Sequence, residues 1–216
     1  MEKFVFVSDF DGTLSLKDFY HIIIDKYMKE EGTNLYKDWK NNKYTDIEFL
    51  NKIFNAINRS EEEIYQDILT IPIDSHAKKF IEKITSSGGS FVVLSAGTIY
   101  YIEKLFKQLG ITDISIISNN GIYKDGGIHL IPDKLSPFYS DFYGIDKGLV
   151  IKKLKKEFEK VYFAGDSKPD LKASAEADLV FAKEPLASML TEKGCKFVPF
   201  KEFKEIDIYL SEIGVI

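Results

Sequence analysis

The chain has 216 residues, of which 44% are hydrophobic and 29% are charged, which is ordinary for a globular protein with one large domain or two small ones. Its formal net charge of −5 disfavours a nucleic-acid groove or an anionic membrane surface, so we expect no nucleic-acid partner and no membrane partner. Cys195 is the only cysteine, which excludes an intrachain disulfide and favours a cytoplasmic location.

The first predicted element is a buried strand over residues 4–8 that ends in two aspartates. Four hydrophobic residues in succession (FVFV) are typical of a strand that is covered on both faces. Asp9 and Asp11 follow at a spacing of two, so that in an extended chain both carboxylates point the same way. Two carboxylates this close repel each other, and a bound cation such as Mg²⁺ offsets that repulsion. A plain turn is the alternative, because Asp11-Gly12 is a common turn pair.

Residues 15–75 lack any buried-strand pattern and instead show apolar residues at helical spacing. Within them, Ser60 followed by Glu63 is the signature of a capping box at a helix N-terminus. We therefore expect an all-helical cap domain over residues 15–75, inserted into a core domain made of residues 1–14 and 76–216. Inserts that follow the first strand at the ligand-binding edge of an α/β sheet commonly act as lids that exclude water. A helical subdomain without a gating role is the alternative.

Strand and helix patterns alternate through the rest of the chain, which is typical of parallel βαβ units. We expect an α/β fold whose doubly wound, mostly parallel sheet is Rossmann-like. Residues 120–131 predict a β-hairpin that turns at Asp125-Gly126-Gly127. The predicted strands cover residues 91–94, 114–117, 161–164, 179–181 and, more weakly, 197–198, and the predicted helices cover residues 98–109 and 147–159.

Two groups near these elements are candidates for binding a phosphate. The segment Ser95-Ala96-Gly97 follows a predicted strand, where the Ser95 hydroxyl and nearby backbone N–H groups can hold phosphate oxygens. A simple helix N-cap is the alternative for this segment. Lys147 begins a predicted helix, which is an uncommon position for a cation, and a solvated surface lysine is the alternative there.

Two further carboxylates, Asp166 and Asp170, follow the predicted strand at residues 161–164. Their alternative role is a favourable interaction with the N-terminus of the next helix. Because the carboxyl ends of parallel strands meet at one edge of a sheet, we expect the polar residues to lie together there. The expected cluster fits one Mg²⁺ ion and one phosphate, and its members are Asp9, Asp11, Ser95, Lys147, Asp166 and Asp170.

In this order along the chain, these residues resemble the four motifs of the haloacid-dehalogenase-like phosphatases. The first motif is DFDGT at residues 9–13, and it is followed by Ser95, by Lys147 and by GDSKPD at residues 165–170. The resemblance covers nearly the whole chain, and a helical cap between the first two motifs is similar to the phosphoserine-phosphatase-like branch. Within that branch, the SAG segment, the hairpin and residues 165–173 are similar to the phosphatases of methionine salvage, which act on 2-hydroxy-3-keto-5-methylthiopentenyl 1-phosphate.

The resemblance implies a Mg²⁺-dependent hydrolase of a small phosphomonoester that works through an aspartyl-phosphate intermediate. It assigns Asp9 as the nucleophile and Asp11 as the general acid and base. The other roles that it implies are phosphate binding by Ser95, Ala96, Gly97 and Lys147, Mg²⁺ binding by Asp9, the Asp11 carbonyl and Asp166, and orientation of a metal-bound water or of Lys147 by Asp170.

Two residues of the expected cap are candidates for contacting the leaving group of the substrate. Phosphoserine phosphatases carry a glutamate nine residues after the nucleophile and a cap arginine; here the corresponding residues are Asp18 and the only arginine, Arg59. A solvated residue at a helix start is the alternative for Arg59. His21 lies near Asp18 on the first expected cap helix, where it could face the substrate, but a surface position is expected. The aromatic residues of 132–145, where methionine-salvage phosphatases have cysteines, either pack the cap on the core or line the pocket.

Two other functions are compatible with these motifs. A phosphomutase of the same superfamily would transfer the phosphoryl group instead of releasing it, although Thr13 favours hydrolysis. A non-catalytic phosphate-binding regulatory module would keep the fold without the chemistry. The sequence determines neither the substrate nor the oligomeric state nor the resting position of the cap.

Overall fold

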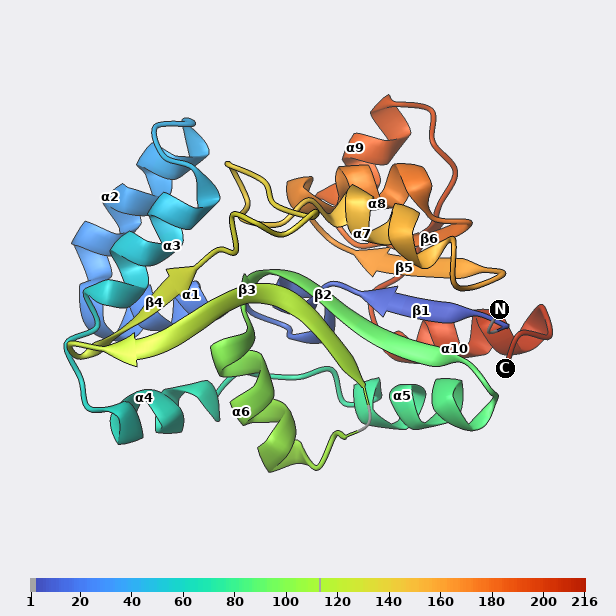
Figure 1. Ribbon diagram of the computed structural model, residues 1–216, viewed down its shortest axis with the longest axis horizontal. Helices are drawn as coiled ribbons and strands as arrows, with labels where there is room; N and C mark the ends of the chain where they lie inside the picture. Colours follow the sequence, from blue (N-terminus) through green and yellow to red (C-terminus); the bar gives the residue numbers. More distant parts are fainter. Residues whose placement is uncertain (1–2, 113) are drawn as a thin grey trace.

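The computed structural model describes residues 3–112 and 114–216, and a seven-stranded sheet lies at the centre of these residues (Figure 1). Across the sheet the order is β4-β3-β2-β1-β5-β6-β7, and β4 alone among the described strands runs antiparallel to its neighbour. This confirms the expected α/β fold with a doubly wound, mostly parallel sheet. The strands are β1 (Val5–Ser8), β2 (Ser90–Thr98), β3 (Ser115–Lys124), β4 (Gly127–Ile131), β5 (Val161–Gly165), β6 (Leu179–Ala182) and β7 (Val198–Pro199).

Helices cover both faces of the sheet, and the side chains around β1 explain why. Phe4 and Phe6 point to one face and Val5 and Val7 to the other, because side chains alternate along a strand. None of the four is more than 2% exposed, so this strand is buried on both sides, as its apolar run predicts. The phenylalanine face packs on α5 (Ala77–Ser86), α6 (Ile99–Leu109) and α10 (Phe203–Glu212), and the valine face packs on α7 (Lys147–Leu154), α8 (Leu171–Glu176) and α9 (Leu186–Glu192) (Figure 1).

A helical insert follows β1 and confirms the expected all-helical cap. Its capping box is present, since Ser60 accepts a hydrogen bond from the backbone of Glu63 and the Glu63 side chain accepts one from the backbone of Ser60. None of the helices in the described part of the chain is long and apolar enough to span a membrane. The elements of the insert are α1 (Phe19–Ile23), the π-helical turn η2 (Ile24–Met28), α2 (Lys29–Lys40), α3 (Asp46–Asn55) and α4 (Glu61–Ile68).

The chain enters and leaves this insert through two segments that lie side by side. Leu16 N donates a hydrogen bond to Pro72 O at 2.8 Å, and Asp74 N donates one to Leu14 O at 3.0 Å. In Figure 1, α3 lies beside β4 and α2 packs on α3, whereas α4 lies on the side of the sheet where α6 packs. The boundaries of the two expected domains stay a prediction.

Two predicted elements end at other residues than expected. The helix predicted to continue to residue 159 ends at Leu154, because the chain has to reverse its direction before β5 begins at Val161. The strand predicted at 114–117 and the first strand of the hairpin form one continuous strand, β3, whose second half pairs with β4. The hairpin itself turns after Lys124, as its glycines predict.

Candidate active site

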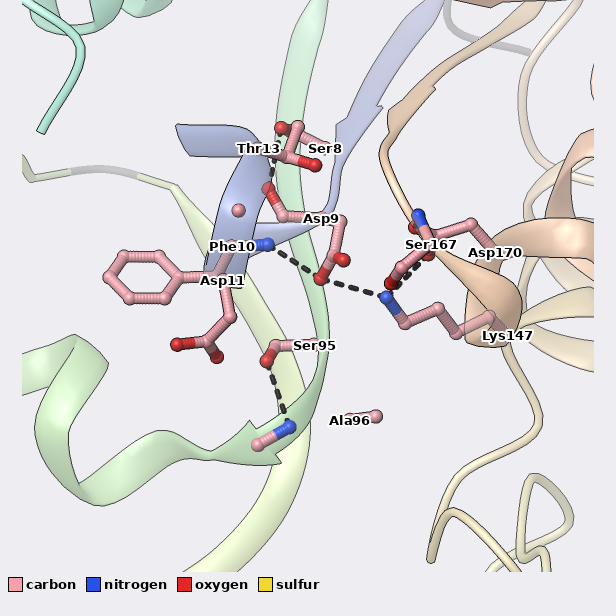
Figure 2. Close-up of polar contacts among 12 residues, drawn as sticks. Ser8, Asp9, Phe10, Asp11, Thr13, Ser95, Ala96, Lys147, Ser167 and Asp170 are labelled. Atoms are coloured by element: carbon pink, nitrogen blue, oxygen red, sulfur yellow. Dashed lines mark hydrogen bonds and ion pairs between the residues drawn. The ribbon is translucent and has the colours of Figure 1, made fainter. Parts of the chain in front are cut away.

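The residues directly after β1 form a tight turn that places Asp9 at the carboxyl edge of the sheet (Figure 2). Asp9 has an extended backbone, and its Oδ1 accepts a hydrogen bond from Phe10 N at 2.6 Å. The turn η1 (Phe10–Leu14) continues through Gly12, whose φ is +78°. A Cβ atom at Gly12 would lie 2.6 Å from Oδ2 of Asp166, so glycine is required where this turn approaches the end of β5.

A buried ammonium joins Asp9 to Asp170 (Figure 2). Nζ of Lys147, the first residue of α7, lies 2.8 Å from Oδ1 of Asp9 and 2.6 Å from Oδ1 of Asp170. The other oxygen of Asp170 accepts hydrogen bonds from the backbone N–H groups of Asp166 and Ser167 at 3.0 and 3.1 Å. Burial alone would lower the pKa of Lys147, but the two carboxylates raise it above its usual value, so the ammonium stays charged.

Three carboxyl groups gather around this ammonium. One oxygen each of Asp9, Asp166 and Asp170 lies within 4.8 Å of the others. Burial, together with the charge of Asp170, raises the pKa of Asp9 well above its usual value and the pKa of Asp166 to about 8. Thr13 Oγ1 opposes the shift at Asp166 by donating a hydrogen bond to its Oδ1 at 2.9 Å. One ammonium thus faces three acidic groups, and this all-oxygen donor set fits a hard divalent cation such as Mg²⁺.

Asp11 has partners of a different kind from those of Asp9. Its Oδ2 accepts a hydrogen bond from the hydroxyl of Tyr101 at 2.5 Å, and its Oδ1 accepts one from Phe19 N at 3.2 Å. Burial and the nearby charge of Asp18 raise the pKa of Asp11 to about 7. The two carboxylates that the sequence places side by side therefore have different electrostatic surroundings, although both line one cavity.

The segment Ser95-Ala96-Gly97 lies inside β2, and not in a strand-to-helix turn as the sequence predicts. The pairing of β2 with β3 shifts between Leu94 and Thr98, so the segment bulges out of the regular ladder. Within it, Oγ of Ser95 accepts a hydrogen bond from Gly97 N at 3.0 Å (Figure 2). Thr98 is the N-cap of α6, which leaves the hydroxyl of Ser95 beside the cavity.

These groups line a cavity of about 520 Å³ that lies between the edge of the sheet and the helical insert. Asp170 is fully buried behind Lys147 and does not belong to the lining. The predicted site residues that do line it are Asp9, Asp11, Asp18, Ser95, Ala96, Gly97, Lys147 and Asp166.

The side of the cavity formed by the insert is an aromatic wall, made of Tyr20, Tyr36, Trp39 and Phe49. The rings of Trp39 and Phe49 are stacked with their centroids 4.5 Å apart, and Nε1 of Trp39 donates a hydrogen bond to Oδ1 of Asp46 at 2.7 Å. Burial raises the pKa of Asp46 to about 6, although the bond from Trp39 opposes the shift. The aromatic wall therefore presents apolar ring faces beside one carboxyl group, that of Asp46, which the hydrogen bond from Trp39 holds in place.

The predictions for His21 and Arg59 have different outcomes. His21 was expected on the surface, but it lines the cavity, because its ring packs against Tyr20 and Tyr36 with centroids 4.4 and 5.2 Å away. Arg59 lies outside the lining: its guanidinium is 4.7 Å from the centroid of the Tyr27 ring, and its Nε is 3.9 Å from Glu63. In this conformation Arg59 does not reach the cavity.

The aromatic segment 132–145 takes one of its two expected roles through its side chains, which line the pocket. Phe142 and Tyr143 line the cavity. The carbonyl of Phe142 accepts a hydrogen bond from Asp46 N in the insert at 3.0 Å, and the carbonyl of Tyr143 accepts one from Nδ2 of Asn119 in β3 at 3.0 Å. The segment therefore connects the insert to the sheet and forms part of the pocket at the same time.

Two residues near the site were not predicted. Lys183 directly follows β6, and its Nζ donates a hydrogen bond to Thr13 O at 2.9 Å, which holds the turn after β1. The rule that polar residues at the carboxyl ends of strands share one edge would have found it. Tyr101 has no such signal, because its position on α6 looks like any other position of a buried helix face.

Residues 6–175 match the family of haloacid dehalogenase-like hydrolases. Because the match covers most of the chain, the protein belongs to this family. The chain is also 26% identical over 214 residues to a 2-hydroxy-3-keto-5-methylthiopentenyl-1-phosphate phosphatase of Bacillus velezensis, and the alignment covers 97% of this chain and 91% of that protein.

Solved structures of phosphoserine phosphatases have the same fold. One, described as a phospho-aspartyl intermediate analogue, has a TM-score of 0.70 at 22% identity and covers 97% of this chain and 99% of its own. The enzyme from T. onnurineus has a TM-score of 0.67 at 23% identity, with 97% and 94% covered. The family match confirms the predicted family, and these structures confirm the predicted fold, a Rossmann-like core with a helical cap.

Proposed function

We propose that this hydrolase releases phosphate from a small phosphomonoester, with Mg²⁺ as cofactor and through an aspartyl-phosphate at Asp9. The observation that carries the proposal is that one cavity holds two buried carboxyl groups with different partners. The ammonium of Lys147 lowers the pKa of Asp9 against the larger raising effects of burial and Asp170, whereas Asp11 lies beside the neutral hydroxyl of Tyr101. Two carboxyl groups with such different surroundings suit a nucleophile and a general acid.

The proposed reaction has two steps. In the first, a carboxylate oxygen of Asp9 attacks phosphorus, the bond from phosphorus to the ester oxygen breaks, and the proton of Asp11 moves to that leaving oxygen. In the second, the oxygen of a water molecule attacks phosphorus while Asp11, now a carboxylate, takes one proton from that water. The bond between phosphorus and Asp9 then breaks, which frees phosphate and returns both aspartates to their starting states.

We assign the binding of the phosphate to the groups around Asp9. The hydroxyl of Ser95, the backbone of Ala96 and Gly97, and the ammonium of Lys147 line the cavity beside it. Because Lys147 is buried and stays charged, it can bind phosphoryl oxygens as negative charge develops on them.

Mg²⁺ would be held by the carboxylates of Asp9 and Asp166 and by the backbone carbonyl of Asp11. When bound there, it supplies positive charge beside the phosphoryl oxygens. Both oxygens of Asp170 already accept hydrogen bonds, one from Lys147 and one from two backbone amides. We therefore assign Asp170 to holding Lys147 in place and not to the metal.

The first candidate substrate has an apolar tail, as in 2-hydroxy-3-keto-5-methylthiopentenyl 1-phosphate. The aromatic wall offers ring faces to such a tail, and the relative from Bacillus velezensis carries this name. Phosphoserine is the second candidate, because Asp18 lines the cavity and offers a carboxylate to an ammonium group. The carboxylate of phosphoserine would then have to bind Lys40 or Lys168, since Arg59 lies outside the lining.

Phosphate release from a panel of both candidates, sugar phosphates and aryl phosphates tests the function. We expect Mg²⁺-dependent release that Asp9→Asn lowers by about a thousandfold or more while the variant stays folded. Asp25→Asn is the matched control, because Asp25 is exposed, forms an ion pair with Lys17 and lies outside the cavity lining. Release by Asp9→Asn at the wild-type rate would refute the nucleophile, transfer without release would indicate a phosphomutase, and no reaction would indicate a binding module.

We also propose a cytoplasmic location and a small-molecule phosphomonoester as the partner. The single cysteine, Cys195, is free and exposed, which suits a reducing compartment. Fractionation of cells that produce the protein tests this assignment, and recovery from an oxidising compartment would contradict it.

A further inference from the structure

A buried tyrosine, Tyr101, lies where the sheet, the helical insert and Asp11 meet. It is 1% exposed, and its ring packs against Phe10 of the turn after β1 and against Phe19 and Phe54 of the insert, with centroids 5.8, 5.1 and 6.2 Å away. Its hydroxyl is the only polar atom of the side chain, and it donates to Oδ2 of Asp11 at 2.5 Å. The apolar surroundings hold the ring, so the hydroxyl has one fixed position relative to the carboxyl group.

The segment that forms the phosphate side of the cavity leaves space for this hydrogen bond. A Cβ atom at Gly97 would lie 1.8 Å from the hydroxyl oxygen of Tyr101 and 2.9 Å from Oδ2 of Asp11. Both distances are shorter than van der Waals contact, so a side chain at Gly97 would separate the two groups. The contact between Tyr101 and Asp11 is therefore built by α6, the turn after β1 and the bulge of β2 together.

The hydroxyl proton of Tyr101 is directed towards Asp11. In the hydrogen bond between the two side chains, the hydroxyl of Tyr101 is the donor and Oδ2 of Asp11 is the acceptor. Burial raises the pKa of Tyr101 far above its usual value, so the phenol stays protonated. Phe19 N donates to the other oxygen of Asp11 at 3.2 Å. Both partners thus donate, and the acidic proton of Asp11 itself remains for a substrate.

We propose that Tyr101 is a positioning residue that fixes the carboxyl group of Asp11 so that its proton reaches the leaving oxygen of the substrate. The proposal rests on the proposed function, in which Asp11 is the general acid. Its consequence is a dependence on the leaving group. An alkoxide needs a proton as the bond to phosphorus breaks, whereas a nitrophenolate leaves readily without one. Removing the hydroxyl should therefore slow alkyl phosphates more than p-nitrophenyl phosphate.

Tyr101→Phe tests this, because it removes one oxygen and keeps the ring. Tyr100→Phe is the matched control: Tyr100 is the residue directly before Tyr101 on α6, its hydroxyl also donates to a carboxylate, Glu61, at 2.7 Å, and it lies outside the cavity lining. The quantity to compare is kcat/KM, which reports the steps up to departure of the leaving group. It is measured for p-nitrophenyl phosphate and for the best alkyl or enol phosphate of the panel.

For Tyr101→Phe we expect kcat/KM to fall about 10- to 100-fold with the alkyl or enol phosphate and to stay within about threefold with p-nitrophenyl phosphate. Tyr100→Phe should leave both values unchanged. An equal loss with both substrates, or no loss with either, would overturn the positioning role while leaving the proposed function intact. If the wild-type protein hydrolyses neither compound, the proposed function fails, and this inference fails with it.

Discussion

Replacing Lys147 by methionine should destabilise the metal-free protein strongly, because the lysine is the shared partner of two buried carboxylates. Its Nζ lies 2.8 Å from Asp9 and 2.6 Å from Asp170, and the residue is 2% exposed. Removing one member of a buried ion pair costs about 3–5 kcal/mol, because the remaining charge is left without compensation. For a chain of this length, that loss corresponds to a fall in Tm of roughly 6–20 °C.

The loss from Lys147→Met should depend on pH in a defined direction. The pKa of Asp9 is already raised by burial and by Asp170, and it rises further when Lys147 is removed. A carboxyl group whose pKa is higher in the folded than in the unfolded state destabilises the fold above its unfolded pKa of about 3.9. The difference between variant and wild type should therefore be larger at pH 8 than at pH 5. Adding Asp9→Asn to the variant should restore part of the stability, because one uncompensated carboxylate is then gone.

The assay is urea unfolding of both proteins in the presence of a chelator at the two pH values. Lys152→Met is the control on the same helix, because Lys152 is exposed and its Nζ lies 3.3 Å from the carboxylate of Glu176. An exposed pair of this kind contributes less than about 1 kcal/mol. The reasoning about Lys147 is refuted if its loss is no larger than that of Lys152→Met, or if the loss is the same at both pH values.

Two further predictions concern other carboxylates. Asp166→Asn should raise the Mg²⁺ concentration needed for half-maximal activity by about tenfold or more, and a Mg²⁺ titration that is unchanged would contradict the proposed ligand. Asp207→Asn should lower the free energy of unfolding by about 1–3 kcal/mol at pH 7, because Asp207 accepts hydrogen bonds from Lys83 at 2.5 Å and contacts His76 at 2.8 Å. Burial raises the pKa of Asp207, but the contacts with Lys83 and His76 outweigh it and lower this pKa. The contribution of Asp207 to the free energy of unfolding is therefore present above the unfolded pKa of about 3.9 and is lost as the pH falls through the lower pKa of the folded state. Urea midpoints between pH 7 and pH 3 check this, and a difference that persists unchanged at pH 3 would be inconsistent with it.

The sheet and the gathering of polar residues at its edge could be predicted because both follow from local patterns. The apolar run before Asp9 requires a strand covered on both faces, and parallel strands bring their carboxyl ends to one edge. The structure accordingly brings Asp9, Lys147 and Asp170 into contact, although more than 130 residues separate Asp9 from the other two in the chain. For this prediction it was enough to know that side chains alternate between the two faces along a strand.

Positions within the helical insert could not be predicted in the same way. Helical spacing shows which face of a helix is apolar, but the direction of that face depends on how the helices pack. His21 was therefore expected on the surface although it lines the cavity, and Arg59 was a candidate for substrate binding although it packs on Tyr27. The contact of Tyr101 with Asp11 joins residues 90 positions apart and requires the space left at Gly97.

The insert and the sheet share one hydrophobic core, and this limits how the insert can move as a lid. Phe19 and Phe54 of the insert are no more than 1% exposed, and their rings pack on Tyr101 of α6. Separating the insert completely would expose both phenylalanines at a cost of about 3–6 kcal/mol. At that cost fewer than about one molecule in a hundred is fully open. Access to the cavity therefore favours smaller movements of α2, which carries Tyr36 and Trp39 of the aromatic wall, over a displacement that would also break the contact between Phe19 N and Asp11.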